Sequence, residues 1–247
     1  MTEKELWVQK CNDWKTKWPV MQPEYYDDSD RKLNLYAVLD AVSKYSPEDS
    51  VIVGDAGSIS YAGPQAIRAK KGQRLIFSPS QADMGWALPA AIGIALAGAP
   101  QVICITGDGS FMSNMQELAV IQQHQLNIKI IILNNGGYLS IKNTQQKYFD
   151  GRVHGTSTES GLWFPDFFDI AIAFRIHYHT FPLVVTMDND FPEIFKTKTP
   201  LIMNCFCKED QEILPAQALK NGKQAGLHDM TPFLSDEELE KEMIIKI

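Results

Sequence analysis

The sequence predicts an α/β fold with three layers, in which a parallel β-sheet is covered by helices on both faces. Three observations predict it. Short, continuous apolar segments alternate along the chain with longer helix-like segments. Strands of a parallel sheet read as continuous apolar runs because both of their faces are buried. With 247 residues, of which 45% are hydrophobic, the chain is long enough to bury a sizeable core.

Charge and cysteine content limit the class of protein. The net charge of -7 disfavours nucleic acid and anionic membranes as partners. No apolar run approaches the roughly 20 residues that span a bilayer, and the charged start "MTEKELWVQKC" has no signal-peptide core. Cys205 and Cys207 lie two residues apart, so in a strand both face one side as a buried pair of thiols. We therefore expect a reducing, cytoplasmic setting.

The first segment, 1–33, is predicted to be a helix followed by a polar connector. Thr2 and Glu5 have the spacing of a capping box, and Pro19 ends the helical pattern. Apolar side chains recur on one face of this helix: Trp7, Cys11, Trp14 and Trp18. Such a face needs a cover, which is either the body of this chain or a preceding domain or partner.

The second segment, 34–207, carries the alternating pattern and is predicted to be the main domain. Its helix-like stretches are 34–45, 87–98, 114–125 and 165–174. Its strand-like stretches are 50–57, 74–77, 101–106, 129–135, 182–187 and 200–207, with 175–179 on a further strand or its rim. The last segment, 208–247, is a more polar tail that packs on the domain or a partner and contains a short acidic helix at 235–244.

An aspartate between two glycines follows one apolar strand directly. Asp108 lies between the two glycines of "VICITGDG", and 24 residues separate Gly109 from a polar pair, Asn134 and Asn135, that ends the next strand. This spacer has room for one helix and one strand, which is one βαβ crossover. If the two strands are neighbours, the Asp108 carboxylate and an amide of the pair meet at the carboxyl edge of the sheet, where ligands of such folds bind.

These groups indicate a site for a hard cation and a phosphate. A carboxylate, an amide oxygen and a turn carbonyl suit Mg²⁺, which keeps open positions for phosphate oxygens. Gly107 and Gly109 let a bulky anion approach the backbone at the start of a helix. Ser113 and Gln116 have capping-box spacing and predict that this helix starts at Ser113. A dinucleotide Rossmann site is disfavoured, because no G-x-G-x-x-G motif follows the first strand.

The stretch "GDGSFMSNMQELAVIQQHQLNIKIIILNN" resembles the diphosphate-binding motif of the thiamine-diphosphate enzymes. The neighbouring "MGWALPAAIGIALA" and the later "DQEILP" resemble the acetolactate synthase family. The resemblance covers nearly the whole chain, most specifically 54–149, and is to the C-terminal third of those enzymes.

The resemblance implies a thiamine diphosphate and Mg²⁺ site, and no catalytic residue on this chain. It implies metal ligands in the side chains of Asp108 and Asn135 and the carbonyl of Gly137. It implies that Met84 is the apolar side chain on which the cofactor bends, beside the backbone of Ala82. The full set of cofactor residues that it implies is Gly57, Ser58, Ala82, Met84, Asp108, Gly109, Ser110, Asn135, Gly137, Tyr138 and Leu139.

The chemistry that the resemblance implies is the cofactor's addition to a 2-oxo acid, followed by loss of carbon dioxide. In the family, the glutamate that activates the cofactor lies on a pyrimidine-binding domain that this sequence lacks. Glu117 and Glu159 are not assigned to that role. We therefore expect a partner chain or a missing region to supply the pyrimidine-binding domain, a small 2-oxo acid as substrate, and an oligomer.

Two departures from the plant and bacterial acetolactate synthases bear on the substrate. Thr144 stands where those enzymes carry a channel tryptophan, and Ser140 stands where they carry methionine. The predicted function is the diphosphate and Mg²⁺ module of a thiamine-diphosphate-dependent carboligase or decarboxylase, a transferase or lyase component that is incomplete alone. The alternative is a non-catalytic binding or regulatory protein that retains the fold.

The histidines are not needed for this function. His124 is expected on a helix surface, and His177 and His179 on a strand. His154 lies in the glycine-flanked stretch "GRVHGTSTESG", which serves either as an ordinary loop or as a segment that closes over a substrate.

Overall fold

The fold is described by a computed structural model that covers residues 2–244. The chain divides into two compact units, with the division after Gln211. Residue 1 and residues 245–247 of the predicted tail lie outside the described part. The domain boundaries expected from the sequence stay a prediction.

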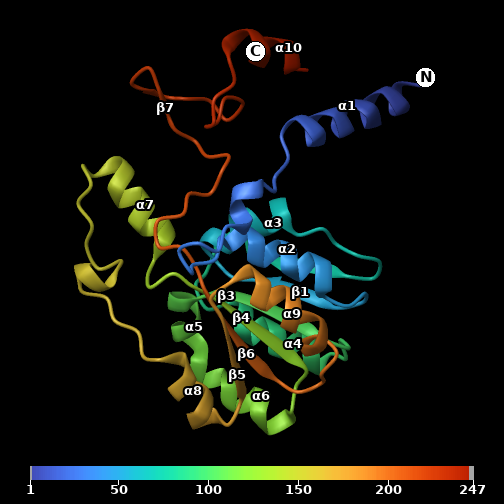
Figure 1. The fold of residues 1–247 in the computed structure, drawn as a ribbon, viewed down its shortest axis with the longest axis vertical. Helices are drawn as coiled ribbons and strands as arrows, with labels where there is room; N and C mark the ends of the chain where they lie inside the picture. The colour runs from blue at the N-terminus through green and yellow to red at the C-terminus, as the bar shows by residue number, and fades with distance from the viewer. Residues whose placement is uncertain (1, 245–247) are drawn as a thin grey trace. The chain divides into compact units, whose positions relative to one another are not determined.

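A six-stranded parallel sheet forms the centre of the first unit, with the strand order β2-β1-β3-β4-β6-β5 (Figure 1). Every pairing in it is parallel, and the predicted fold class is confirmed. The strands are β1 (Val51–Gly54), β2 (Arg74–Phe77), β3 (Val102–Gly107), β4 (Ile128–Asn134), β5 (His177–Phe181) and β6 (Leu201–Phe206).

Helices cover both faces of this sheet (Figure 1). Alternate strand residues such as Val51, Val53 and Ile130 pack in one buried cluster with the helices of the first face. That face carries α4 (Ala87–Leu96), α5 (Asp108–Asn114), α6 (Leu118–His124) and α8 (Phe167–Phe174). The other face carries α2 (Leu35–Tyr45), α3 (Ser58–Ala66) and α9 (Val184–Ile194).

The order of the strands creates a switch point between β1 and β3. The chain leaves β1 for β2 on one side and then returns to form β3 on the other side. Loops that follow β1 and β3 therefore diverge at the carboxyl edge of the sheet, which opens a crevice there. The register aligns Gly107 of β3 with Leu133 of β4, so Asp108 and Asn135 follow neighbouring strand ends as predicted.

The first unit also contains helical elements that were not named above. They are α1 (Glu3–Lys17), η1 (Pro23–Tyr26), η2 (Met115–Glu117), α7 (Leu139–Tyr148) and η3 (Thr158–Ser160). The second unit contains β7 (Leu219–Lys220), which pairs with β8 (Lys223–Gln224), and the predicted acidic helix α10 (Asp236–Glu242). No helix between residues 2 and 244 is both long and apolar enough to span a membrane.

The predicted N-terminal helix is present, and its apolar face is uncovered. Thr2 and Glu5 form the expected capping box. No residue of α1 is buried, and the Trp7 side chain is 51% exposed. Trp7 and Trp14 contact each other edge to face, with 5.8 Å between their ring centroids. The face is therefore not covered by the described body of the chain.

Residues 182–187 were expected to form a strand, and this prediction was wrong. Residues 184–187 instead begin α9, and the reason is a tertiary cap. The carboxylate of Asp28 accepts hydrogen bonds from the backbone N–H groups of Val184 (2.7 Å) and Val185 (3.3 Å). The first N–H groups of a helix have no partner inside the helix, so an acceptor at that end stabilises it. Asp28, 156 residues away in the sequence, provides this acceptor and stabilises a helix in a β-branched segment.

The predicted helix start at Ser113 was also wrong. Helix α5 begins at Asp108, directly after β3, and a 3-10 turn at Met115–Glu117 separates it from α6. The Ser113 hydroxyl does not cap a helix start, because it donates a hydrogen bond to the carbonyl oxygen of Gly109 one turn earlier. The capping-box spacing was therefore present without its geometry.

Asp28→Ala is expected to lower the free energy of unfolding of the chain by about 1 kcal/mol, within the roughly 0.5–2 kcal/mol typical of lost helix caps. Asp27→Ala is the matched control, because among the residues that the structure describes Asp27 accepts only from the neighbouring Ser29. Urea denaturation followed by circular dichroism measures both variants. Equal losses in the two variants would contradict the capping role of Asp28.

Candidate functional site

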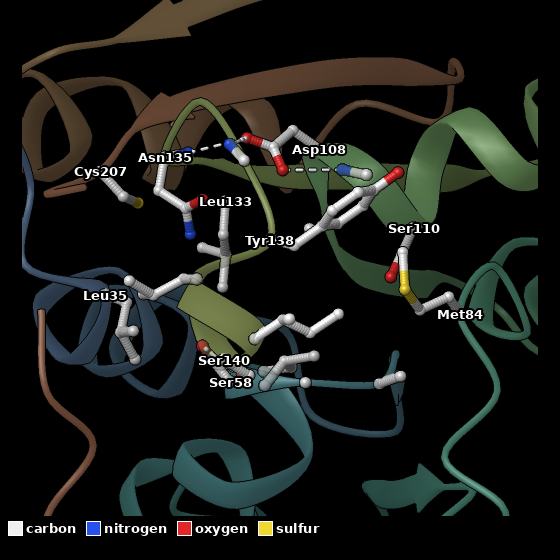
Figure 2. Close-up of a pocket in the computed structure, with 18 of the residues that line it drawn as sticks. Leu35, Ser58, Met84, Asp108, Ser110, Leu133, Asn135, Tyr138, Ser140 and Cys207 are labelled. Carbon is white, nitrogen blue, oxygen red and sulfur yellow. Dashed lines mark hydrogen bonds between the residues drawn. The ribbon is translucent and has the colours of Figure 1, made fainter. Parts of the chain in front are cut away.

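A cavity of about 280 Å³ lies at the carboxyl edge of the sheet, at the switch point between β1 and β3 (Figure 2). The loops after β1, β2, β3 and β4 contribute its walls. All eleven residues predicted from the sequence line it, namely Gly57, Ser58, Ala82, Met84, Asp108, Gly109, Ser110, Asn135, Gly137, Tyr138 and Leu139. The structure thus brings the predicted set together in one place.

The Asp108 carboxylate is the centre of the polar part of this cavity. It is 1% exposed and accepts hydrogen bonds from the backbone N–H groups of Gly109 (2.7 Å), Asn135 (3.1 Å) and Gly137 (3.1 Å). Figure 2 shows these bonds reaching from Asp108 to the loop after β4. Burial raises the pKa of the Asp108 carboxyl to about 6, and the backbone bonds oppose this by stabilising the charge.

The Asn135 side chain has a buried acceptor without a partner. Its Oδ1 atom is inaccessible to water and accepts no hydrogen bond in the described structure. An unpaired buried oxygen costs free energy, so such atoms indicate a group that the structure does not contain. Asn135 and Asp108 both line the cavity, and a hard cation such as Mg²⁺ fits a donor set of amide and carboxylate oxygens.

Gly137 is held tightly against the segment after α7. A Cβ atom there would lie 2.1 Å from the carbonyl oxygen of Thr156, so no other residue fits without a backbone shift. Gly137 and Ser157 form an isolated antiparallel bridge, and the N–H of Tyr138 donates to the Thr156 carbonyl at 3.0 Å. This packing fixes the turn after β4, and with it the Gly137 carbonyl.

Gly109 makes room for the ring of Tyr138. A Cβ atom at Gly109 would lie 2.2 Å from Cε1 of Tyr138. The tyrosine ring therefore lies directly over the first turn of α5, across the cavity from Ser58 and Ser140 (Figure 2). The Ser58 and Ser140 hydroxyl oxygens are 3.5 Å apart and connect the starts of α3 and α7.

Three helices begin at this cavity, and no side chain caps any of their starts. These are α3 after Gly57, α5 after Gly107 and α7 after Tyr138. The starts of α1, α2, α8 and α10 each have a side-chain cap, whereas those of α4 and α6, whose residues do not line the cavity, have no N-cap side-chain bond. Because uncapped N–H groups and helix dipoles attract negative charge, the cavity suits an anion such as a diphosphate.

The apolar part of the cavity lies in the loop between β2 and α4. Met84 projects from this loop and is 39% exposed. Ala82 in the same loop has a φ of 53°, an uncommon conformation for a residue with a side chain. Leu35, Tyr61, Leu133, Ile141 and Cys207 also line the cavity, and none of them was predicted from the sequence.

Asp55 is the polar residue that sequence reasoning missed. It follows β1 and is 2% exposed, and its carboxylate accepts from four donors that belong to Ala56, Gly85, Ala87 and Thr106. Burial raises its pKa above the ordinary value. The signal in the sequence was the one that identified Asp108, an acid directly after a buried apolar strand.

The other candidate residues lie away from the cavity wall. His177 and His179 are on β5 as predicted, and His124 is exposed at the end of α6. Glu117 is in η2, and Glu159 is exposed in η3. Ser140 is the exception, because it lines the cavity. Thr144 donates to the Ser140 carbonyl one turn away. His154 is exposed, and its backbone is bonded to the side chain of Gln145.

The thiol groups are free, as expected. All four cysteines are unpaired, and Cys205 and Cys207 are both buried. Burial raises the pKa of both thiols well above the ordinary value, so both are neutral.

Comparison with known families matches residues 55–205 to the family described as "Thiamine pyrophosphate enzyme, C-terminal TPP binding domain". The acetolactate synthase large subunit of Cyanidium caldarium is 30% identical over 228 residues, which are 90% of this chain and 37% of that protein. The acetolactate synthase isozyme 2 large subunit of Escherichia coli K12 is 33% identical over 169 residues, 67% of this chain and 30% of that protein. The chain thus spans about a third of the length of these relatives.

A solved structure has a similar fold. It is the thiamine diphosphate-dependent 4-hydroxybenzoylformate decarboxylase of Rhodococcus jostii RHA1, with a TM-score of 0.65 at 23% sequence identity. The similarity covers 74% of this chain and 34% of that chain. At this identity it supports the three-layer fold.

Gly109→Ala is expected to destabilise the chain by about 1–3 kcal/mol, because the added methyl group displaces the Tyr138 ring in a close-packed site. Gly107→Ala is the matched control. Its Cβ atom meets nothing within 4 Å, and its φ of -81° suits any residue. Urea denaturation of the two variants measures the difference, and equal stabilities would contradict the close contact between Gly109 and Tyr138.

Proposed function

Because this chain belongs to the thiamine pyrophosphate enzymes, through their C-terminal TPP binding domain, we propose that it holds the diphosphate and Mg²⁺ of thiamine diphosphate in a carboligase or decarboxylase of 2-oxo acids. The observation that carries the proposal is the unpaired Asn135 Oδ1 beside the buried Asp108 carboxylate in a cavity where uncapped helices begin. The three features together suit a metal-bound diphosphate.

The proposed metal ligands are the side chains of Asp108 and Asn135 and the carbonyl of Gly137. Their oxygens leave positions of an octahedral Mg²⁺ open for diphosphate oxygens and water. The cation would offset the cost of the buried Asp108 charge, which in the metal-free chain is stabilised only through backbone N–H groups. It would also give the Asn135 oxygen the partner that it lacks.

The proposed diphosphate contacts are made by the helix starts. Gly57 and Ser58 lie at the start of α3, and Gly109 and Ser110 lie in the first turn of α5. Backbone N–H groups and hydroxyls at these starts would donate to phosphate oxygens, while the Gly109 N–H itself donates to the Asp108 carboxylate. Tyr138 and Leu139 at the start of α7 would close the third side.

The apolar end of the cavity would hold the rings of the cofactor. Met84 would be the side chain on which the molecule bends, beside the backbone of Ala82. When bound, thiamine diphosphate supplies a carbon nucleophile and an electron sink for breaking the bond next to the carbonyl of a 2-oxo acid. The residues of this chain would bind, orient and shield it from water.

The activating glutamate would come from outside the described residues. Neither Glu117 nor Glu159 lines the cavity, so neither is placed to contact the cofactor. The chain spans about a third of the length of its relatives, and we propose that a pyrimidine-binding domain, from a partner chain or from a region beyond this sequence, completes the site. The domain organisation that we propose is 1–33 as helix and connector, 34–207 as the binding domain and 208–247 as a tail.

We propose that the working form is an oligomer in the cytoplasm. The exposed tryptophan face of α1 offers apolar surface for a partner, since such surface is uncommon on monomers. Four free cysteines suit a reducing compartment. The reaction class would be that of a transferase or a lyase, on a small 2-oxo acid.

Calorimetric titration of thiamine diphosphate into the chain is expected to give binding that requires Mg²⁺. Asp108→Ala and Asn135→Ala should each weaken this binding by a few kcal/mol, because the remaining oxygens cannot complete the coordination. Asp150→Ala is the control, since its carboxylate is 94% exposed and does not line the cavity. Equal binding by the wild type and Asp108→Ala would remove the metal assignment.

The isolated chain is expected to be inactive toward pyruvate and other 2-oxo acids, because no glutamate of the described residues lines the cavity. The assay compares carbon dioxide release by the chain with that of free cofactor, alone and after addition of a pyrimidine-binding domain. Turnover by the chain alone would contradict the incomplete site. Cofactor binding without turnover in any combination would favour the non-catalytic alternative.

A further inference from the structure

The loop that carries Met84 is attached to the body of the protein through its neighbour Gly85. Gly85 is buried, and its N–H donates to Oδ1 of Asp55 at 3.0 Å. The same carboxylate accepts from the N–H of Ala87 at 3.4 Å, in the first turn of α4. Asp55 therefore connects the end of β1 to the residues that directly follow Met84.

A second side chain holds Gly85 from the opposite direction. Asn114, at the end of α5, donates from Nδ2 to the Gly85 carbonyl oxygen at 2.8 Å. A Cβ atom at Gly85 would lie 2.7 Å from Cβ of Ser113 and 3.1 Å from the carbonyl oxygen of Ser110. Both polar groups of the Gly85 backbone are thus paired with side chains, and the loop lies directly on α5.

The loop needs such anchors because one of its residues, Ala82, has a strained φ of 53°. Gly85 has a φ of 85°, which glycine adopts without strain. Left-handed backbone costs about 1 kcal/mol or more for a residue with a side chain, so it persists where the surroundings impose it. Between these two residues Met84 is 39% exposed, so packing alone does not fix its side chain.

We propose that Asp55 and Asn114 are positioning residues that hold Gly85 from both sides and thereby set where Met84 stands in the cavity. This inference rests on the proposed function, because its purpose is to present Met84 to the rings of thiamine diphosphate. Asp55 itself does not line the cavity. Its effect on a ligand would therefore pass through the loop.

The proposal separates the two ends of the ligand. The diphosphate end would contact the starts of α3 and α5, and the ring end would contact Met84. Asp55 also accepts from the N–H of Ala56, one residue before Gly57 and the start of α3, so its loss reaches both ends. Asn114 holds the Gly85 carbonyl from the far end of α5, so its loss should weaken binding of thiamine diphosphate but not of inorganic diphosphate, whereas a general loss of folding would weaken both.

Four variants distinguish the anchor from its charge and from the nearby packing. Asp55→Ala and Asn114→Ala remove one anchor each. Asp55→Asn removes the charge and the 3.4 Å bond from Ala87, because an amide nitrogen cannot accept. Its amide oxygen can still accept from Gly85 while Thr106 turns its hydroxyl to accept from the new amide. Thr106→Val is the control, because it removes a 3.0 Å bond to Asp55 and leaves both bonds to Gly85 in place.

Amide hydrogen exchange of the unliganded chain tests the anchors themselves. Exchange of the amide of Gly85 should accelerate about tenfold or more in Asp55→Ala, as for a lost hydrogen bond to a charged group. It should stay near the wild-type rate in Asp55→Asn and Thr106→Val. An unchanged rate in Asp55→Ala would overturn the proposal whatever the ligand of the cavity is.

Calorimetry with Mg²⁺ and either thiamine diphosphate or inorganic diphosphate tests the use of the anchors. We expect Asp55→Ala and Asn114→Ala to lose about tenfold or more in affinity for thiamine diphosphate, and Asn114→Ala to bind inorganic diphosphate as the wild type does. Asp55→Asn should restore most of the thiamine diphosphate binding. Parallel losses for both ligands in Asn114→Ala would overturn the positioning role, while a wild type that binds neither would instead refute the proposed function.

Discussion

The buried carboxylate of Asp108 is the group on which the candidate site depends. It joins the end of β3 to the turn after β4 by accepting from the backbone of Asn135 and Gly137. Without a cation, its charge is stabilised by these N–H groups against burial, which raises its pKa to about 6. The turn that Asp108 holds also contains the unpaired oxygen of Asn135. A buried charge held only by backbone N–H groups among the described residues, together with an acceptor without a partner in the same turn, would be stabilised by the cation that we propose.

The helix starts around the cavity also present polar groups that no N-cap side chain pairs. Helices whose ends serve only the fold, such as α2 and α8, have side-chain caps from Asn34 and Asp166. The starts of α3, α5 and α7 have none, although a cap stabilises a helix by about 1 kcal/mol. Helices α4 and α6 also lack an N-cap side-chain bond, so what sets the three starts apart is that they meet at one cavity, where their N–H groups would face a bound anion.

The polar and apolar ends of the cavity differ in how firmly their residues are held. Its polar end is built from rigid elements, because Gly109 packs on Tyr138 and Gly137 on Thr156 with no space for a Cβ atom. Its apolar end is a loop with Met84 partly exposed, held through Gly85 by Asp55 and Asn114. One half of a ligand would meet a preformed cradle, and the other half would meet a surface that a further domain can cover. This arrangement agrees with a chain that spans about a third of its relatives' length.

The sequence by itself determined the fold class and the strand ends, because continuous apolar runs in a parallel sheet are a local pattern. It also placed Asp108 one crossover from the pair Asn134 and Asn135, and the family resemblance named eleven of the residues that line the cavity, though not its apolar wall residues such as Leu35 and Tyr61. Local patterns failed where a distant residue decided the outcome. Residues 184–187 became helical because Asp28 caps α9, and the capping spacing at Ser113 was unused because α5 already starts at Asp108. The anchoring of Gly85 by Asp55 and Asn114 was visible only in three dimensions, because hydrogen bonds between segments about 30 residues apart leave no periodic trace in a sequence.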